Sequence, residues 1–269
     1  MHVVSLNVNG IRAAVRRGLL AWVAEKGPEL ICLQEIRAPQ SQLPLRKFEQ
    51  LGYESIWNLG SRPGYSGVGI LSRIEFEPLA NPLDDPATEH EGRFVAVRAG
   101  GTVVANSYVP NGNSGPGRLE VKLTHLRALR DWTKHQLAAA GRLLLAGDFN
   151  IAAEPIDVTR PTHPTGFLPS ERKAFAALLD LGLADCFRVF HPGEPGHYTW
   201  WENWPGSRER NIGWRFDYLL ASPLLAQELY ECRHEQEPRL SDHCVVAGEF
   251  ARIRRGRARE PDDRRARRA

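Results

Sequence analysis

Short apolar runs alternate with amphipathic segments along almost the whole chain, and this alternation restricts the possible folds more than any other feature. The runs at 2–8 and 29–34 have the length and the branched residues of strands, whereas 10–27 and 117–140 carry apolar residues near helical spacing. Gly27-Pro28 is a helix-ending pair that closes the first of these helices. The pattern predicts an α/β protein whose helices cover its sheets.

The other expected elements follow the same plan. They are strands at 67–72, 93–99, 102–109 and 142–150, a helix at 170–181, and strands at 214–222 and 243–250. The first three of these strands are interpreted as an antiparallel run, in which Gly100-Gly101 joins the last two as a tight hairpin. No linker rich in Pro, Gly or Ser divides the chain, so we expect one domain over residues 1–250 and a tail over 251–269.

The tail differs from the domain in charge. Residues 251–269 hold nine arginines against Glu260, Asp262 and Asp263, a net charge of +6, whereas the whole chain carries +3. The domain is therefore slightly acidic, and a basic surface on it must be a local patch. Because the tail has little apolar surface to bury, we expect it to be disordered. It is either a solvated appendage or a source of non-specific affinity for nucleic acid through counterion release.

The composition disfavours several classes of protein. The N-terminus lacks the charged, apolar and small-residue regions of a secretory signal, and no apolar run approaches the length of a membrane span. The four cysteines lie far apart without a C-x-x-C pair, which disfavours a zinc knuckle and a disulfide framework. We therefore expect a soluble cytoplasmic protein with reduced cysteines.

Polar side chains stand at or near the ends of five apolar elements. They are Asn7 and Asn9, Glu35, Asp148 and Asn150, Asp217, and Asp242 with His243. Each of them alone fits an ordinary turn or cap. Together, four carboxylates on buried strands need a shared counter-charge, because an unpaired buried carboxylate is costly. Oxygen ligands without clustered Cys or His favour Mg²⁺, or Mn²⁺, over Zn²⁺.

An aromatic and basic segment precedes Asp217. It contains Trp200, Trp201, Trp204, Trp214 and Phe216 together with Arg208, Arg210 and Arg215. This combination offers stacking surface next to phosphate contacts, as in nucleic-acid-binding proteins. The alternative is that several of these tryptophans belong to the core, since large aromatic residues are highly buried on average.

Seven motifs resemble a known family in order and spacing. They are LNVNGIR, LQE, SGVGILS, SYVPNG, GDFNIA, NIGWRFDYLLAS and SDHC, and they run from Met1 to about Phe250. The resemblance is to the exonuclease III class of apurinic/apyrimidinic (AP) endonucleases, within the endonuclease/exonuclease/phosphatase superfamily. It implies a four-layer α/β sandwich in which two mixed β-sheets pack face to face with helices on the outside.

The resemblance also implies roles for individual residues. The metal, Mg²⁺ or Mn²⁺, would be bound by Glu35 and Asp242, with Asn7 and Asn9 close by. The catalytic residues would be Tyr108, Asp148, Asn150, Asp217 and His243. Of these, Asp148 would position or deprotonate the attacking water, Asn150 would orient the water or a phosphate oxygen, and Tyr108 would lie against the phosphate. His243, held in its tautomer by Asp217, would donate to a non-bridging phosphate oxygen.

The DNA contacts that the resemblance implies come from a separate set of side chains. They are Asn111, Arg118, Trp200, Trp204, Arg210 and Trp214. Trp200 and Trp214 would line a pocket for a flipped-out abasic deoxyribose, which costs less to extrude than a paired nucleotide. Two departures from the human-type enzyme stand out. Asn9 replaces an aspartate, which removes a negative charge near the metal, and Ser114 replaces an arginine that enters the DNA.

The leading hypothesis is a Mg²⁺-dependent nuclease that cuts 5′ to abasic sites in duplex DNA, with some 3′-5′ exonuclease or 3′-phosphodiesterase activity. We expect a monomer that acts on duplex DNA with abasic sites or blocked 3′ ends, without a membrane, at the bacterial nucleoid. The alternatives are a small-molecule or lipid phosphodiesterase or phosphatase of the same superfamily, and a catalytically silent nucleic-acid-binding relative. The sequence leaves open the balance of the two nuclease activities, the number of metal ions, the general base and any action on RNA.

Overall fold

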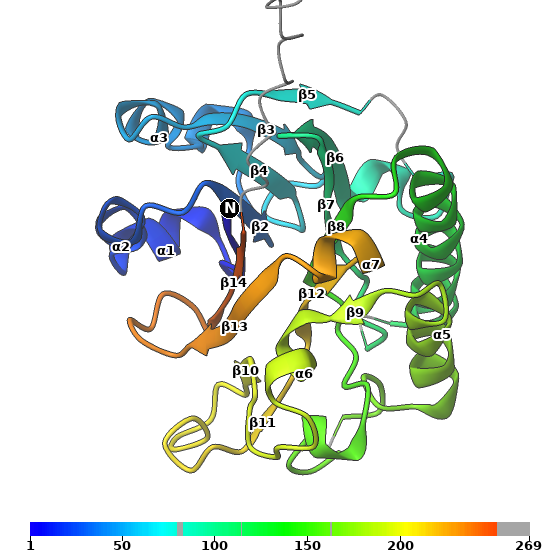
Figure 1. Cartoon of the computed structure of the whole chain (residues 1–269). Coiled ribbons are helices and arrows are strands. Elements are labelled where there is room, and N and C mark those ends of the chain that lie inside the picture. The colour runs from blue at the N-terminus through cyan, green and yellow to red at the C-terminus, as the bar shows by residue number, and fades with distance from the viewer. Residues whose placement is uncertain (80–82, 114, 162, 252–269) are drawn as a thin grey trace, which may run out of the picture.

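Two six-stranded mixed sheets lie face to face between outer helices (Figure 1). The computed structural model describes residues 1–79, 83–113, 115–161 and 163–251. Ser114 and nearly all of the expected tail, residues 252–269, lie outside the described residues.

The first sheet has the strand order β13-β14-β1-β2-β4-β3, and the second has the order β5-β6-β7-β8-β12-β9. The first sheet consists of β1 (His2–Asn7), β2 (Leu30–Gln34), β3 (Glu54–Asn58), β4 (Val68–Ser72), β13 (Leu229–Glu235) and β14 (Val245–Phe250). The second consists of β5 (Phe76–Pro78), β6 (Phe94–Ala99), β7 (Thr102–Tyr108), β8 (Leu143–Asp148), β9 (Ala184–Asp185) and β12 (Asp217–Ala221). A two-stranded ribbon, β10 (Trp200–Trp201) and β11 (Gly213–Trp214), stands apart from both.

Helices cover the outer face of each sheet. On the first sheet these are α1 (Ile11–Arg16), α2 (Leu19–Lys26) and α3 (Leu45–Gln50), and on the second they are α4 (Arg118–Ala140) and α5 (Pro169–Leu179) (Figure 1). The short elements are η1 (Gln40–Gln42), η2 (Glu89–Glu91), η3 (Pro155–Asp157), α6 (Cys186–Phe190) and α7 (Pro223–Ala226). In the described part of the chain, no helix is long and apolar enough to cross a membrane.

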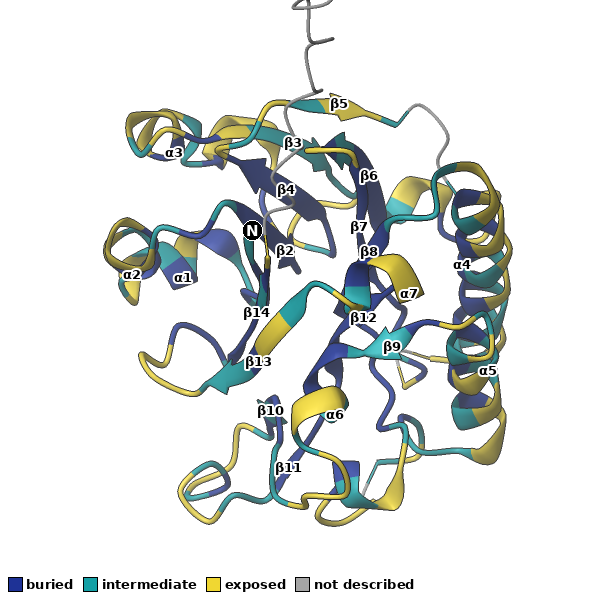
Figure 2. Cartoon of the chain, viewed as in Figure 1, coloured by how far each residue is buried: buried dark blue, intermediate teal, exposed yellow. Residues whose placement is uncertain are grey.

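The buried residues confirm the expected four layers. Val3, Val97 and Leu144 belong to a core between the sheets, and separate cores lie between each sheet and its helices. Figure 2 shows the central strands of both sheets buried and the outward sides of the helices exposed. Burial on both faces explains why the strand sequences are nearly continuous apolar runs rather than alternating ones.

Three details of the expected secondary structure were wrong. The strands expected at 67–109 do not form one antiparallel run, because β4 pairs with β2 and β3 whereas β6 and β7 pair in the other sheet. An apolar strand buried on both faces fits either sheet, so its pattern does not choose between them. The helix expected at 10–27 is divided at Gly18, whose φ of 102° is outside the helical range. The strand expected at 214–222 begins only at Asp217.

Strand directions bring the polar strand ends together. β1 runs parallel to β2, and β7 runs parallel to β8, so within each sheet the last residues of the two strands lie at the same edge. β12 runs antiparallel to β8, which places Asp217 opposite Asp148, while Tyr108 lies opposite Asp148 on the other side. The edges of both sheets therefore meet the same cavity.

Candidate active site

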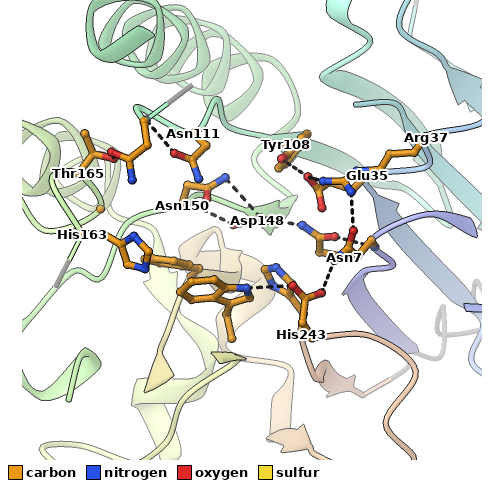
Figure 3. A pocket seen from close by; sticks show the side chains of 16 residues that line it. Asn7, Glu35, Arg37, Tyr108, Asn111, Asp148, Asn150, His163, Thr165 and His243 are labelled. Carbon is orange, nitrogen blue, oxygen red and sulfur yellow. Dashed lines mark hydrogen bonds and ion pairs between the residues drawn. The ribbon is translucent and has the colours of Figure 1, made fainter. Parts of the chain in front are cut away.

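A cavity of about 190 Å³ lies where these strand ends meet (Figure 3). Eleven of the residues singled out in the sequence line it: Asn7, Asn9, Glu35, Tyr108, Asn111, Asp148, Asn150, Trp200, Phe216, Asp242 and His243. Asp217 lies behind the wall, bonded to His243. Residues separated by most of the length of the chain therefore share one site.

Asp148 ends β8 inside a net of amide donors. Its Oδ1 accepts the backbone N–H of Asn150 at 2.8 Å, and its Oδ2 accepts the Asn7 side-chain amide at 2.9 Å. Burial and the neighbouring Asp217 carboxylate raise the pKa of Asp148 to about 7, although His243 and Asn7 oppose this rise. Asp148 can therefore take up and release a proton near neutral pH.

Gly147 makes the position of Asp148 possible. Its φ is 146°, and a Cβ added there would lie 1.9 Å from the carbonyl oxygen of Ser107 on β7. Only glycine allows this close approach of β7 and β8. The glycine that interrupts the apolar run thus sets the place of the carboxylate after it.

His243 and Asp217 form a buried pair at the inner wall. His243 Nδ1 lies 2.8 Å from Asp217 Oδ2, and both side chains are almost fully buried. Burial alone would lower the pKa of His243. The Asp217 carboxylate, together with Asp148 and Asp242, has the opposite effect, and the net result is a pKa raised to about 10. The ring is therefore a cation at neutral pH, with Nε2 left to face the cavity. Thr199 Oγ1 accepts the backbone N–H of Asp217 at 3.1 Å and so holds the main chain from which this carboxylate projects.

Asp242 precedes His243 in a segment that is neither helix nor regular strand, so both side chains reach the same cavity. Its Oδ1 accepts the Asn9 side-chain amide at 2.9 Å, and its Oδ2 accepts the Trp200 indole N–H at 3.2 Å. Burial raises the pKa of Asp242, but His243 and these hydrogen bonds outweigh it and lower the pKa overall. Asp242 is therefore ionised at neutral pH.

Glu35 lies on the opposite wall, between a tyrosine and an arginine. Tyr108 donates a short hydrogen bond to Glu35 Oε1, and Arg37 donates to the same oxygen at 2.9 Å. Arg37 also donates to Asn9 Oδ1 at 2.6 Å, so its guanidinium links two residues expected near the metal. Burial and the Glu35 carboxylate raise the pKa of Tyr108 well above its usual value, which keeps the phenol protonated.

Sequence reasoning missed Arg37 and its strained backbone. Asn9, Glu35, Arg37 and Asn150 all have positive φ, between 42° and 54°. Such angles are uncommon outside glycine, and they cluster at functional sites. The available signal was the position of Arg37 two residues after Glu35, where a charged residue follows a buried strand.

Only some of the residues expected to contact DNA line the cavity. Asn111 and the half-buried Trp200 line the cavity, whereas Trp214, its partner on the β10–β11 ribbon, is buried and does not line the cavity. Trp204 is exposed, and the Arg210 guanidinium lies 5.1 Å from the centre of its ring. Arg118 is engaged by Glu91 through two hydrogen bonds, of 2.7 and 3.0 Å.

His163 is a further cavity residue that the sequence did not single out. Its ring centre lies 5.4 Å from both the Trp200 and the Trp214 ring centres, and Phe216 stacks on Trp200 at 5.4 Å. The rings of His163, Trp200 and Phe216 form an aromatic wall of the cavity. Thr165 also lines the cavity and donates to Asn113 Oδ1 at 2.8 Å across its rim.

The charges of the site fit a divalent cation. Four carboxylates, those of Glu35, Asp148, Asp217 and Asp242, lie in or behind the cavity wall. They are offset there by the Arg37 guanidinium and the His243 imidazolium. Asp148 and Asp217 offer carboxylate oxygens within 4.8 Å of each other, and Asp217 Oδ1 has no hydrogen-bond partner among the described residues. A buried acceptor without a partner in a net-negative cavity is what a bound cation would satisfy.

Comparisons with known proteins show the family to which the chain belongs. The model of the Endonuclease/Exonuclease/phosphatase family matches residues 4–243. An exodeoxyribonuclease of Bacillus subtilis is 32% identical over 250 residues, which cover 91% of this chain and 98% of the relative. An AP endonuclease structure from Archaeoglobus fulgidus has a TM-score of 0.85 at 30% identity, covering 93% of this chain and 99% of that one. The 3′ phosphatase NExo from Neisseria, bound to a product DNA hairpin, has a TM-score of 0.84 at 30% identity, covering 94% and 100%. The chain therefore belongs to the endonuclease/exonuclease/phosphatase family and, within it, to the exonuclease III class.

Proposed function

We propose that this protein is a DNA repair nuclease that hydrolyses the phosphodiester 5′ to abasic sites in duplex DNA and also removes nucleotides or blocking groups from 3′ ends. The observation that carries the proposal is the convergence of Asp148, the His243–Asp217 pair and the Glu35 and Asp242 carboxylates on one cavity. Relatives of known activity support the substrate, since they include an AP endonuclease and a 3′ phosphatase bound to product DNA.

Glu35 and Asp242 would hold Mg²⁺, with Mn²⁺ as a substitute, and Asn7 and Asn9 would lie close by. Oxygen donors of this kind suit Mg²⁺, which prefers carboxylates, waters and phosphate oxygens. When bound, the ion would neutralise charge on the phosphate oxygens and stabilise the leaving alkoxide.

Asp148 would act on the attacking water. A carboxylate with a pKa near 7 can accept a proton from a water that it also positions, and Asn150 beside it can orient that water. Asn7 holds the carboxylate through its amide, so the direction of the accepting oxygen is fixed before substrate binds.

His243 would donate its Nε2–H to a non-bridging phosphate oxygen. The Asp217 carboxylate keeps the ring protonated and turned toward the cavity, so the donor is charged and in place when negative charge grows in the transition state. The Tyr108 hydroxyl, kept protonated by burial and Glu35, would lie against the same phosphate.

The aromatic wall would select the lesion. Trp200, His163 and Phe216 give one side of the cavity an apolar surface, and a cavity of about 190 Å³ suits a sugar without its base. Trp204 and Arg210 lie outside this wall, where an exposed ring and a cation can meet the flanking DNA strand. We propose that the protein works as a monomer in the cytoplasm, at the bacterial nucleoid.

The test is an incision assay on duplex DNA with a single abasic analogue, with Mg²⁺ or with EDTA, read by product length. We expect cleavage on the 5′ side of the lesion in Mg²⁺ alone, no such band from the undamaged duplex, and shortening of a recessed 3′ end. Absence of incision, together with hydrolysis of a small phosphodiester, would instead indicate the small-molecule phosphodiesterase. DNA binding without hydrolysis of either substrate would indicate the silent relative.

A further inference from the structure

The loop after α6 gathers a second group of possible metal ligands, away from the cavity. Residues 191–197, with the sequence HPGEPGH, place two imidazoles and a carboxylate three residues apart. His191 Nδ1 lies 3.0 Å and His197 Nε2 lies 3.1 Å from the same oxygen, Glu194 Oε2. All three ligand atoms lie within 4.8 Å of one another.

Neighbouring side chains hold the backbone of this loop. Arg188 Nη1 donates to the carbonyl oxygens of His191 at 3.0 Å and Glu194 at 2.7 Å. Asn211 donates to the carbonyl oxygen of Gly196 at 2.8 Å. These bonds fix the loop on both sides of Glu194. An ion that binds there therefore pays only a small entropy cost for ordering the loop.

Aromatic stacking also fixes the ring of His191. Phe187 of α6 stacks on His191 at 4.3 Å between ring centres and on His234 of β13 at 3.8 Å, so the two imidazoles lie on opposite faces of Phe187. Neither ring nitrogen of His234 has a hydrogen-bond partner in the part of the chain that the structure describes. His234 lies across Phe187 from His191 and is not one of the three ligands, but its stacking helps to hold the Phe187 ring against which His191 packs.

We propose that His191, Glu194 and His197 bind a divalent transition-metal ion, and that Zn²⁺ fits them best. Two imidazoles and one carboxylate are a Zn²⁺ ligand set, with a fourth position for water, whereas Mg²⁺ prefers oxygen donors alone. The three side chains are 30%, 50% and 37% exposed, so an ion can reach them directly from solvent. The site thus differs in metal preference from the oxygen-rich cavity.

The ion would tie this loop to the active site. His197 lies two residues before Thr199, whose hydroxyl oxygen accepts the backbone N–H groups of Phe216 and Asp217. Fixing His197 therefore restrains the segment that holds the carboxylate behind His243. We expect Zn²⁺ to raise the melting temperature of the protein, because an ion that binds the folded chain stabilises it by mass action.

The experiment measures Zn²⁺ bound by EDTA-treated full-length protein at equilibrium, in excess Mg²⁺ that competes for the oxygen-rich cavity. The wild type is compared with the His191→Ala/His197→Ala double variant and with Glu194→Gln. His135→Ala removes an exposed imidazole on α4 and serves as the matched control. Circular dichroism establishes that each variant is folded.

We expect the wild type and the His135→Ala control to bind one more Zn²⁺ per chain than the double variant, and Glu194→Gln to bind it more weakly. Zn²⁺ should raise the melting temperature of the double variant less than that of the wild type, because the ion can no longer bind the loop at 191–197. Equal Zn²⁺ stoichiometry in the wild type and the folded double variant would overturn the proposal. Zn²⁺ binding is measured without DNA incision, so this experiment tests the metal site independently of the proposed function.

Discussion

Replacing Asp217 by Asn tests how the buried pair works, because it removes the charge and keeps the shape. The difference between a His243 pKa of 6.5 and one of about 10 corresponds to about 5 kcal/mol in favour of the protonated ring. Removing one partner of a buried ion pair typically costs about 3–5 kcal/mol. We therefore expect Asp217→Asn to lower the free energy of unfolding at neutral pH by about 3–5 kcal/mol.

The pH dependence of this loss has a definite sign. The pKa of His243 is raised by folding, so the stability it contributes is fully present below pH 6.5 and is lost as the pH rises through about 10. The gap in unfolding free energy between the wild type and Asp217→Asn should therefore be largest below pH 6.5 and shrink toward pH 10. Urea denaturation across this range measures it, with the exposed Asp180→Asn as the control.

The same substitution should also lower turnover. Without the Asp217 carboxylate, which raises the pKa of His243 most, that pKa should fall from about 10 although Asp148 and Asp242 still raise it, so a smaller fraction of the rings should be protonated at a given pH. Loss of a charged donor to the phosphate typically lowers turnover about a hundredfold. NMR titration of the imidazole reports its pKa directly. A His243 that stays protonated to about pH 10 in Asp217→Asn, or an unchanged unfolding free energy, would refute the reasoning.

Three further predictions follow from single contacts. Asn7→Ala removes a hydrogen bond that lowers the pKa of Asp148, so the acid limb of the kcat/KM profile on abasic duplex should move up by about one pH unit. Arg37→Met removes a cation that competes for Glu35 and Asn9, so half-maximal activity should need less Mg²⁺ in a metal titration. Lys122→Met leaves the buried Glu171 carboxylate unpaired and should lower the unfolding free energy by about 3–5 kcal/mol in urea.

Exposed residues provide the matched controls. Arg12→Met and Lys47→Met remove the same charges from the surfaces of α1 and α3 and should leave the Mg²⁺ requirement and the stability nearly unchanged. An unmoved acid limb in Asn7→Ala would contradict the role of that amide. A higher Mg²⁺ requirement in Arg37→Met, or a stability loss in Lys122→Met no larger than in Lys47→Met, would contradict the other two predictions.

Much of the architecture could be predicted because local pattern determines it. The hairpin at Gly100-Gly101 and the helix ending at Gly27 rest on residues adjacent in the chain, and both were correct. The sheet to which β4 belongs could not be predicted, since a strand buried on both faces carries no sign of its partner. Gly18 divides a helix whose apolar spacing continues through the break, so periodicity did not reveal the division.

In the site, too, features set by neighbouring residues could be predicted from the sequence, whereas contacts between distant segments could not. Carboxylates and amides at the ends of apolar strands could be recognised from sequence, because such groups are costly unless something pairs them. Their mutual distances depend on strand directions that the sequence does not state. Three other contacts join segments that are distant in the chain, and no sequence pattern predicts them. They are the hydrogen bond from Arg37 to Asn9, the packing of the His163 ring against Trp200, and the ion pair of Arg118 with Glu91.

The most direct test of the proposed active site is single-turnover incision of an abasic duplex by Asp148→Asn and His243→Ala, with DNA affinity measured by fluorescence anisotropy on the same preparations. If the two side chains act on the water and the phosphate, the incision rate should fall at least about a hundredfold in each variant, while DNA affinity changes little. A near-normal incision rate in either variant would show that its side chain does not take part in the chemistry assigned to it.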